Sequence, residues 1–361
     1  MSKSVVILGA VWLVAMGACI DPSDPSAEPA SQVVQATLTG CPTWGCGGNS
    51  PLIGPFMLNE LDENGAPNSA HVRLLGFLKD SVKYRVDVVA DKLYARNGRA
   101  VLSGAALVGG NFEVETPAAN GYPAGLVEIE IMHVSDDVTF WQGPATPVET
   151  YELEYTGLDA PIGALMPLCK DPPSGRRDGE NQTYANRFES ILYTGDRYDA
   201  KRKLVTASSY KESTGWFNIA CAGSALAKLH LNRHTTASTI TGFTTTAAER
   251  QTMLKMYTGD FCGTGEPFTQ QGAPMHWSNN KGWSSPPGAM QTYESLWNDH
   301  GAVCLNTHRL HGLSNIDYQG DIQGTATSLG ACPKLSCYAI AGFPNLYLTG
   351  AYMLTQSNGV P

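Results

Sequence analysis

The stretch Val82-Lys83-Tyr84-Arg85-Val86-Asp87-Val88 alternates apolar and polar side chains along its length. Because successive side chains of a strand point to opposite faces, this alternation predicts a half-buried β-strand. Residues 127–131 and 151–155 repeat the same pattern. Segments rich in Gly, Pro and Asn separate these stretches, and such segments favour turns.

A hairpin is predicted directly after the first strand. Asn97-Gly98 separates the runs 93–96 and 99–102, and this dipeptide is typical of a type I′ turn. Several short strands joined by turns predict a β-sandwich or a barrel-like domain over residues 50–170.

A polar segment rich in Pro and Gly, residues 171–181, is the predicted linker to a second domain. That domain, residues 182–361, is expected to be a disulfide-rich α+β domain. One helix is predicted over residues 216–234, because apolar residues recur there at spacings of three and four: Ile219, Ala222, Leu226 and Leu229.

A second helix is predicted to begin at Thr246. Glu249 follows three residues later and completes a capping box, and Gly259 is a typical C-terminal stop. With strands in both parts and helices in the second, the predicted fold class is α+β.

The N-terminal residues 1–19 have the three parts of a secretory signal peptide. Lys3 supplies the positive charge, an apolar run follows, and small residues precede Cys19. This ending resembles a bacterial lipobox, in which Cys19 would carry the lipid. Residues 20–49 begin with a Pro/Ser/acidic stretch and are expected to form a tether. We therefore expect an outer-membrane lipoprotein of the cell envelope that faces the periplasm or the cell surface.

The other eight of the nine cysteines form an even set beyond the predicted signal peptide. An even set in an exported chain is typical of disulfide bonds. Cys221 with Cys262 is the simplest bridge between the two predicted helices, and Cys41–Cys46 and Cys332–Cys337 are close in sequence. All eight are disulfide candidates: Cys41, Cys46, Cys169, Cys221, Cys262, Cys304, Cys332 and Cys337.

The composition argues against a nucleic-acid partner. The chain has 24 Lys and Arg residues against 33 Asp and Glu residues, and no basic cluster stands out. No Walker loop or dinucleotide-binding fingerprint is present, and we expect no cofactor.

Cys221 has an alternative interpretation as a nucleophile. An aromatic residue precedes it and small residues follow it, which is similar to the nucleophile helix of transglutaminase-like enzymes. His276 would then lower the pKa of the thiol and Asp299 would orient the imidazole. A cysteine-dependent hydrolase or acyltransferase is therefore the alternative function, while the even cysteine count favours a disulfide.

His230 and His234 lie four residues apart, a spacing that can chelate zinc on a helix. His308 or His311 is a conceivable third ligand. The glutamate of the metalloprotease motif is missing, because Leu231 holds its place. Cationic groups near the C-terminal end of a helix dipole explain the pair equally well, and no metal site is predicted.

Four runs in the second half of the chain look like the ADYC-domain family. They are residues 216–228, 259–265, 268–272 and 297–305, and the resemblance covers roughly residues 190–340. The tetrad Ala-Asp-Tyr-Cys defines the family and corresponds to residues 259–262 of this chain. Asp260 and Cys262 are kept, whereas Gly259 replaces Ala and Phe261 replaces Tyr. The resemblance implies an exported protein or lipoprotein of a Gram-negative soil bacterium, and it implies no mechanism.

Taken together, these features predict a non-catalytic binding or structural module with a lipid anchor in the membrane. Its expected partner is a protein or a glycan, bound through the late aromatic residues Trp277, Trp283, Tyr293 and Trp297.

Overall fold

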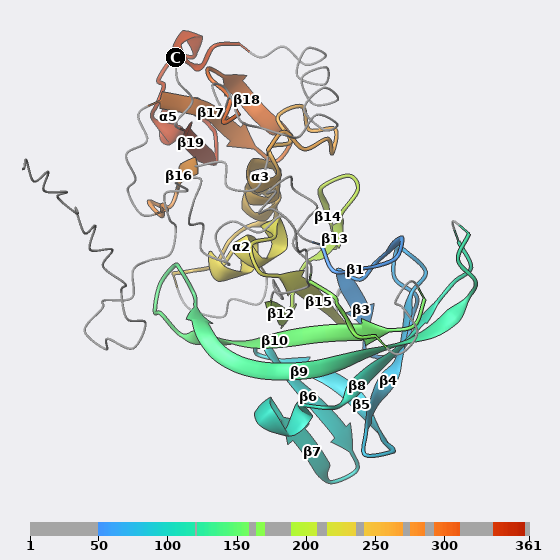
Figure 1. Ribbon diagram of the computed structural model, residues 1–361. Helices are drawn as coiled ribbons and strands as arrows, with labels where there is room; N and C mark the ends of the chain where they lie inside the picture. Colours follow the sequence, from blue (N-terminus) through green and yellow to red (C-terminus); the bar gives the residue numbers. More distant parts are fainter. Residues whose placement is uncertain are drawn as a thin grey trace, which may run out of the picture. The chain divides into compact units, whose positions relative to one another are not determined.

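Antiparallel β-sheets dominate the computed structural model (Figure 1). It describes residues 50–119, 121–158, 164–169, 189–207, 215–235, 242–269, 275–285, 292–310 and 335–357. These residues belong to one compact unit of the chain, 31–361. In this part of the chain, no helix is long and apolar enough to cross a membrane.

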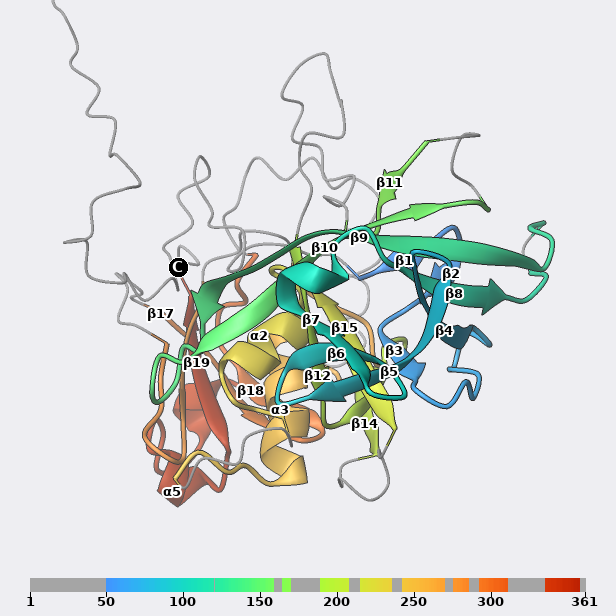
Figure 2. The same ribbon diagram turned by 90° about the horizontal axis from the view of Figure 1, so that it is seen from below.

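The largest sheet has eleven strands. Its order is β3 (Glu60–Asp62), β15 (Trp216–Cys221), β12 (Glu189–Thr194), β10 (Pro147–Thr156), β9 (Gly125–Thr139), β8 (Asn111–Thr116), β4 (Arg73–Lys79), β5 (Val82–Val89), β6 (Lys92–Asn97) and β7 (Ala100–Ser103), and β11 (Met166–Pro167) pairs with β10. The sheet curls, so that β5 and β6 contact β12 and β3 contacts β4. The two long strands β9 and β10 curve visibly in Figure 2.

The alternating stretch at residues 82–88 lies in β5, as predicted, and Val86 and Val88 are buried. The hairpin of β6 and β7 is also confirmed. Its register pairs Asn97 with Ala100, so the two loop residues are Gly98 and Arg99 rather than Asn97 and Gly98. Gly98 has a φ of 57°, which glycine adopts without steric cost.

The helix predicted over residues 216–234 is wrong in its first part. Trp216–Cys221 is strand β15, which pairs with β12 and β3, and helix α2 covers only Ala225–Leu231. Nearly every residue of β15 is buried. A strand buried on both faces is an unbroken apolar run, which periodicity cannot distinguish from a helix.

The second helix is confirmed as α3, Ala247–Thr258. Thr246 and Glu249 form the predicted capping box, and Gly259 ends the helix in the left-handed conformation with a φ of 63°.

A second, four-stranded sheet follows α3. Its order is β16 (Met275–Asn279), β19 (Met353–Ser357), β17 (Thr292–Asn298) and β18 (Gly301–Leu305). Helix α2 contacts β12 and β15 of the large sheet, α3 contacts β17 and β18, and the helices contact each other (Figure 1). The smaller elements are β1 (Leu52–Ile53), β2 (Phe56–Met57), η1 (Gly104–Leu107), β13 (Arg197–Asp199), β14 (Leu204–Ala207), η2 (Cys337–Ala339) and α5 (Leu346–Thr349).

The predicted fold class, α+β, is therefore wrong. The described residues form a mostly β structure of several antiparallel sheets with few helical residues. One part of this error is that residues 216–221 were assigned to a helix, although they form a strand of the large sheet between β3 and β12. The predicted linker, residues 171–181, lies outside the described residues, and strands from both sides of it share the large sheet.

Candidate functional site

Two disulfides join distant parts of the chain. Cys169 is bonded to Cys221, with Cα atoms 5.4 Å apart, and Cys304 is bonded to Cys337, with Cα atoms 4.9 Å apart. Cys262 is also disulfide-bonded. The expected pairs Cys221–Cys262 and Cys332–Cys337 are therefore wrong, because Cys221 and Cys337 have other partners.

Sequence spacing could not identify these pairs. Cys169 and Cys221 are 52 residues apart and meet only because β10, β12 and β15 are neighbours in the sheet. The candidates Cys41, Cys46 and Cys332 lie outside the described residues, and so does Cys19.

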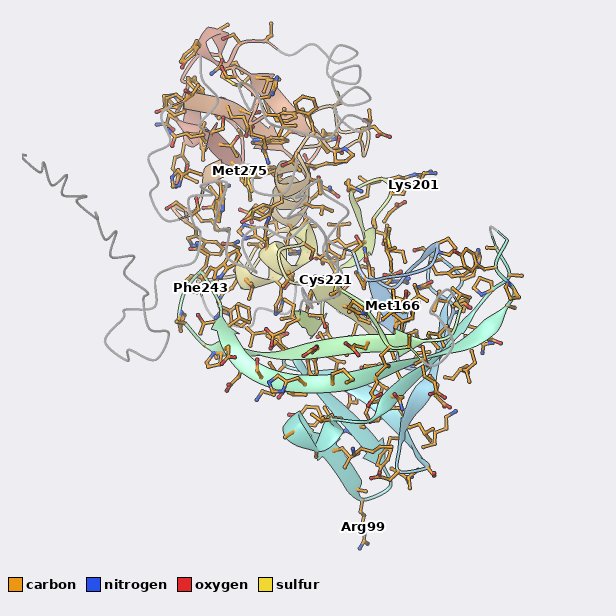
Figure 3. The ribbon with its side chains drawn as sticks, in the orientation of Figure 1. Arg99, Met166, Lys201, Cys221, Phe243 and Met275 are labelled. Atoms are coloured by element: carbon orange, nitrogen blue, oxygen red, sulfur yellow. A yellow bond between two sulfur atoms is a disulfide. The ribbon has the colours of Figure 1, made fainter. Side chains whose placement is uncertain are left out.

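The three residues of the alternative catalytic site have separate partners. Cys221 is fully buried at the end of β15 and lies in its disulfide, so it has no thiol (Figure 3). His276 Nδ1 lies 2.8 Å from the hydroxyl of Ser285. Asp299 Oδ1 lies 2.9 Å from Nδ1 of the exposed His300. A cysteine nucleophile needs a thiolate, and this arrangement holds none at Cys221.

The two histidines of the predicted helix face different surroundings. Helix α2 ends at Leu231, so His234 does not share a helical face with His230. The ring of His230 stacks on Tyr193 at 4.1 Å between centroids, and its Nε2 lies 3.4 Å from Asp91.

His234 instead packs against two tryptophans, with its ring edge-on to Trp277 and Trp283. Its Nδ1 donates to the carbonyl of Asn232 at 2.8 Å. His308 packs edge-on against Phe268, and His311 is outside the described residues. Within the described ranges, no three His, Cys, Asp or Glu side chains are grouped as metal ligands.

The family tetrad at residues 259–262 has a structural role in this chain. The carboxylate of Asp260 is fully buried, and its Oδ2 accepts from Nζ of Lys255 at 2.5 Å and from the backbone N–H of Gly265 at 2.8 Å. Gly259 adopts a positive φ, and a Cβ there would lie 2.5 Å from the carbonyl oxygen of Phe268. The tetrad therefore closes α3 and fixes the loop that follows it.

Phe261 lies in the core beside this ion pair. Its ring centroid is 4.8 Å from that of Trp297 and 5.9 Å from that of Phe268, and the guanidinium of Arg309 lies 5.6 Å from its ring. Arg309 in turn makes a bidentate pair with the buried Glu294, with both distances 2.9 Å. Phenylalanine at this position packs well without needing a hydroxyl group.

A polar cluster between α2 and α3 was missed by the sequence analysis. We call Lys228, Asn232, Tyr257 and Trp277 the Lys228 cluster. The hydroxyl of Tyr257 accepts from Asn232 Nδ2 at 2.7 Å and from Trp277 Nε1 at 3.1 Å. The ammonium of Lys228 lies 5.7 Å from the centre of the Tyr257 ring.

Lys228 is half-buried, and among the described residues its ammonium has no carboxylate or hydrogen-bond partner. Burial lowers the pKa of Lys228 from 10.5 to about 8, and the positive charge of Arg309 acts in the same direction. Burial also raises the pKa of Tyr257 above its ordinary value of 10.0. A half-buried lysine that has a lowered pKa and lacks a carboxylate partner makes this cluster a candidate functional site. No motif marks the cluster in the sequence, because α2 with its C-cap Asn232, α3 and β16 meet there only after folding.

Residues 335–350 form an exposed segment, which we call the C-terminal surface. Leu335, Tyr338, Tyr347 and Leu348 are 67–82% exposed. In contrast, Trp277 and Trp297 of the expected aromatic binding surface are buried, so both belong to the core.

The C-terminal surface is tied to the four-stranded sheet. The Cys304–Cys337 disulfide joins it to β18, and Asn306 Oδ1 accepts from the backbone N–H of Cys337 at 2.8 Å. Asn345 caps the short helix α5 through the N–H groups of Tyr347 and Leu348. The exposed side chains are thus presented on a braced backbone.

Comparison with known proteins gives one match. The model of the ADYC domain matches residues 104–311, so it begins and ends earlier than the resemblance seen in the sequence. No curated protein and no solved structure matches the chain. The family model covers more than half of the chain, and the protein belongs to the ADYC domain family.

Proposed function

We propose that this protein is an exported, lipid-anchored module of the cell envelope that binds a partner protein. The observation that carries the proposal is the oxidised state of the cysteines at positions 169, 221, 262, 304 and 337. Disulfides persist in oxidising compartments and are rare in the cytosol. They support export, and the lipobox-like ending at Cys19 supports the anchor.

Binding is favoured over thiol catalysis because Cys221 is held in a buried disulfide. The C-terminal surface supplies the proposed contact area. It contains no charged residue between Leu335 and Gly350, in a chain of net charge −9. Tyrosine is enriched at protein interfaces, where its ring adds area at low entropic cost.

The exposed side chains favour a protein over a glycan as the partner. Leu335 and Leu348 are 70% and 71% exposed, and such aliphatic side chains gain most from burial against other apolar side chains. The partner surface is therefore expected to be neutral and apolar. The disulfide and the Asn345 cap hold the segment in place, which reduces the entropy lost on binding.

The anchor is tested by producing the full chain and its Cys19→Ala variant in a Gram-negative host that receives an alkyne-labelled fatty acid. The wild-type chain is expected to carry the label and to sediment with membranes, whereas the variant is expected to be unlabelled and released. A wild-type chain that stays unlabelled in the cytosol would disprove the anchor.

The binding surface is tested by placing the photo-cross-linker p-benzoylphenylalanine at Tyr347. The control carries it at Arg99, at the tip of the β6–β7 hairpin (Figure 3). A defined product is expected from position 347 alone. The cross-linked protein is then purified, and its affinity is measured for the wild-type chain and for Tyr347→Ser/Leu348→Ser, which should bind at least about tenfold more weakly. Equal binding of both chains would contradict the proposal.

A further inference from the structure

The Lys228 cluster combines two hydrogen-bond donors that have no acceptor among the described residues. The carbonyl oxygen of Lys228 can only accept, and Asn232 Nδ2 donates to it at 2.9 Å, which fixes the orientation of the Asn232 amide. The same nitrogen and Trp277 Nε1 therefore both donate to Tyr257. Both lone pairs of the Tyr257 oxygen are occupied, so its own O–H proton is left to donate.

The charges around the cluster are not balanced. Arg309 is neutralised by Glu294, whereas Lys228 has no acid within ion-pair distance in the described part of the chain. The cluster thus carries a net charge of +1 in a half-buried position. A buried charge without a partner destabilises a fold unless something neutralises it.

We propose that the ammonium of Lys228 and the hydroxyl of Tyr257 together bind a carboxylate from solution. A carboxylate has a single negative charge, which matches the single uncompensated positive charge. Its two oxygens can each accept from one of the two donors, which belong to neighbouring side chains: Lys228 Nζ lies 5.7 Å from the Tyr257 ring centre. Both side chains are half-buried, so part of each remains open to solvent. This site is independent of the proposed binding at the C-terminal surface.

The first test measures the thermal stability of the full chain in acetate, phosphate and chloride at equal ionic strength. Acetate is expected to raise the melting temperature above that in chloride, in a way that saturates with concentration. In Lys228→Met the acetate effect is expected to be lost, and in Tyr257→Phe the affinity should fall by about fivefold. Lys92→Met, which removes an exposed lysine, serves as the control and should respond like the wild type.

A second measurement follows the Lys228 amine itself. The rate of its reaction with acetic anhydride is measured against pH, with and without acetate, by mass spectrometry of the Lys228 peptide. Bound carboxylate stabilises the charged form, so it should shift the titration of Lys228 to higher pH. An unchanged titration, an equal response of wild type and Lys228→Met, or a stronger effect of phosphate than of acetate would each overturn the carboxylate site.

Discussion

Asp260 and Lys255 form an ion pair in which both side chains are shielded from water. They are 0% and 1% exposed, respectively. Such a pair is costly to break, because the remaining charge is left buried without a partner. The same holds for Arg250 with Asp196 and for Arg309 with Glu294. These charges lie around α3, and the Asp260 carboxylate also accepts from the N–H of Gly265 in the loop that follows the helix.

Asp260→Asn is expected to lower the free energy of unfolding by about 3–5 kcal/mol, because Lys255 keeps its charge in a dry environment. The measurement is urea unfolding followed by circular dichroism. Asp299→Asn is the matched control: its partner His300 is exposed, so the change should be about 0.5 kcal/mol or less. Equal losses of the free energy of unfolding in both variants would contradict the prediction that the buried Asp260 pair is costly to break.

The lowered pKa of His234 predicts how the stability of the fold depends on pH. Burial lowers its pKa from 6.5 to about 4; the nearby Arg250 and Lys281 act in the same direction, while the Asn232 carbonyl and Glu249 oppose the shift. Between pH 6.5 and 4, His234 therefore binds a proton in the unfolded chain but not in the folded chain. The contribution of His234 is fully present above pH 6.5 and is lost as the pH falls through this window, by up to about 3 kcal/mol.

His234→Phe keeps an aromatic ring and removes the titration, so its stability should fall less between pH 6.5 and 4 than that of the wild type. Chemical denaturation at several pH values measures this slope. Parallel slopes for the wild type and His234→Phe would contradict the assignment.

Elements with their own local signals were predictable from the sequence. Strand β5 followed from alternation, and α3 followed from its capping box and Gly259. Strand β15 was not predictable, because β3 and β12 pair with its two edges and its two faces lie in different core clusters, with Phe217 and Ile219 in one and Ala220 in the other. For the same reason the disulfide partner of Cys221 and the neighbours of Lys228 could not be read from spacing, since both depend on which strands and helices are adjacent.

Helix α3 should depend measurably on its capping box. Thr246 Oγ1 accepts from the N–H of Glu249 at 3.2 Å, and Glu249 Oε2 accepts from the N–H of Thr246 at 2.7 Å. Thr246→Ala is expected to lower the free energy of unfolding by about 1 kcal/mol, as measured by thermal or urea unfolding. Thr206→Ala, at an exposed position in β14, is the control. A loss at Thr246 no greater than at Thr206 would mean that packing alone holds the helix.

At the scale of the whole molecule, the described chain is a β-rich scaffold stapled by disulfides. One bond, Cys169–Cys221, closes a segment of 52 residues across the large sheet, and the other, Cys304–Cys337, ties the C-terminal surface to the smaller sheet. Each bond stabilises the fold mainly by restricting the unfolded chain, by about 2–4 kcal/mol. The partner binding that we propose relies on this rigidity and does not involve a reactive thiol.

The central claim, that these cysteines serve structure outside the cytosol, is tested most directly by counting thiols. The full chain is isolated without reductant, alkylated under denaturing conditions, digested and analysed by mass spectrometry. We predict unmodified Cys169, Cys221, Cys304 and Cys337 and two cross-linked peptide pairs, 169 with 221 and 304 with 337. Quantitative alkylation of Cys221 in the denatured, unreduced protein would contradict the account.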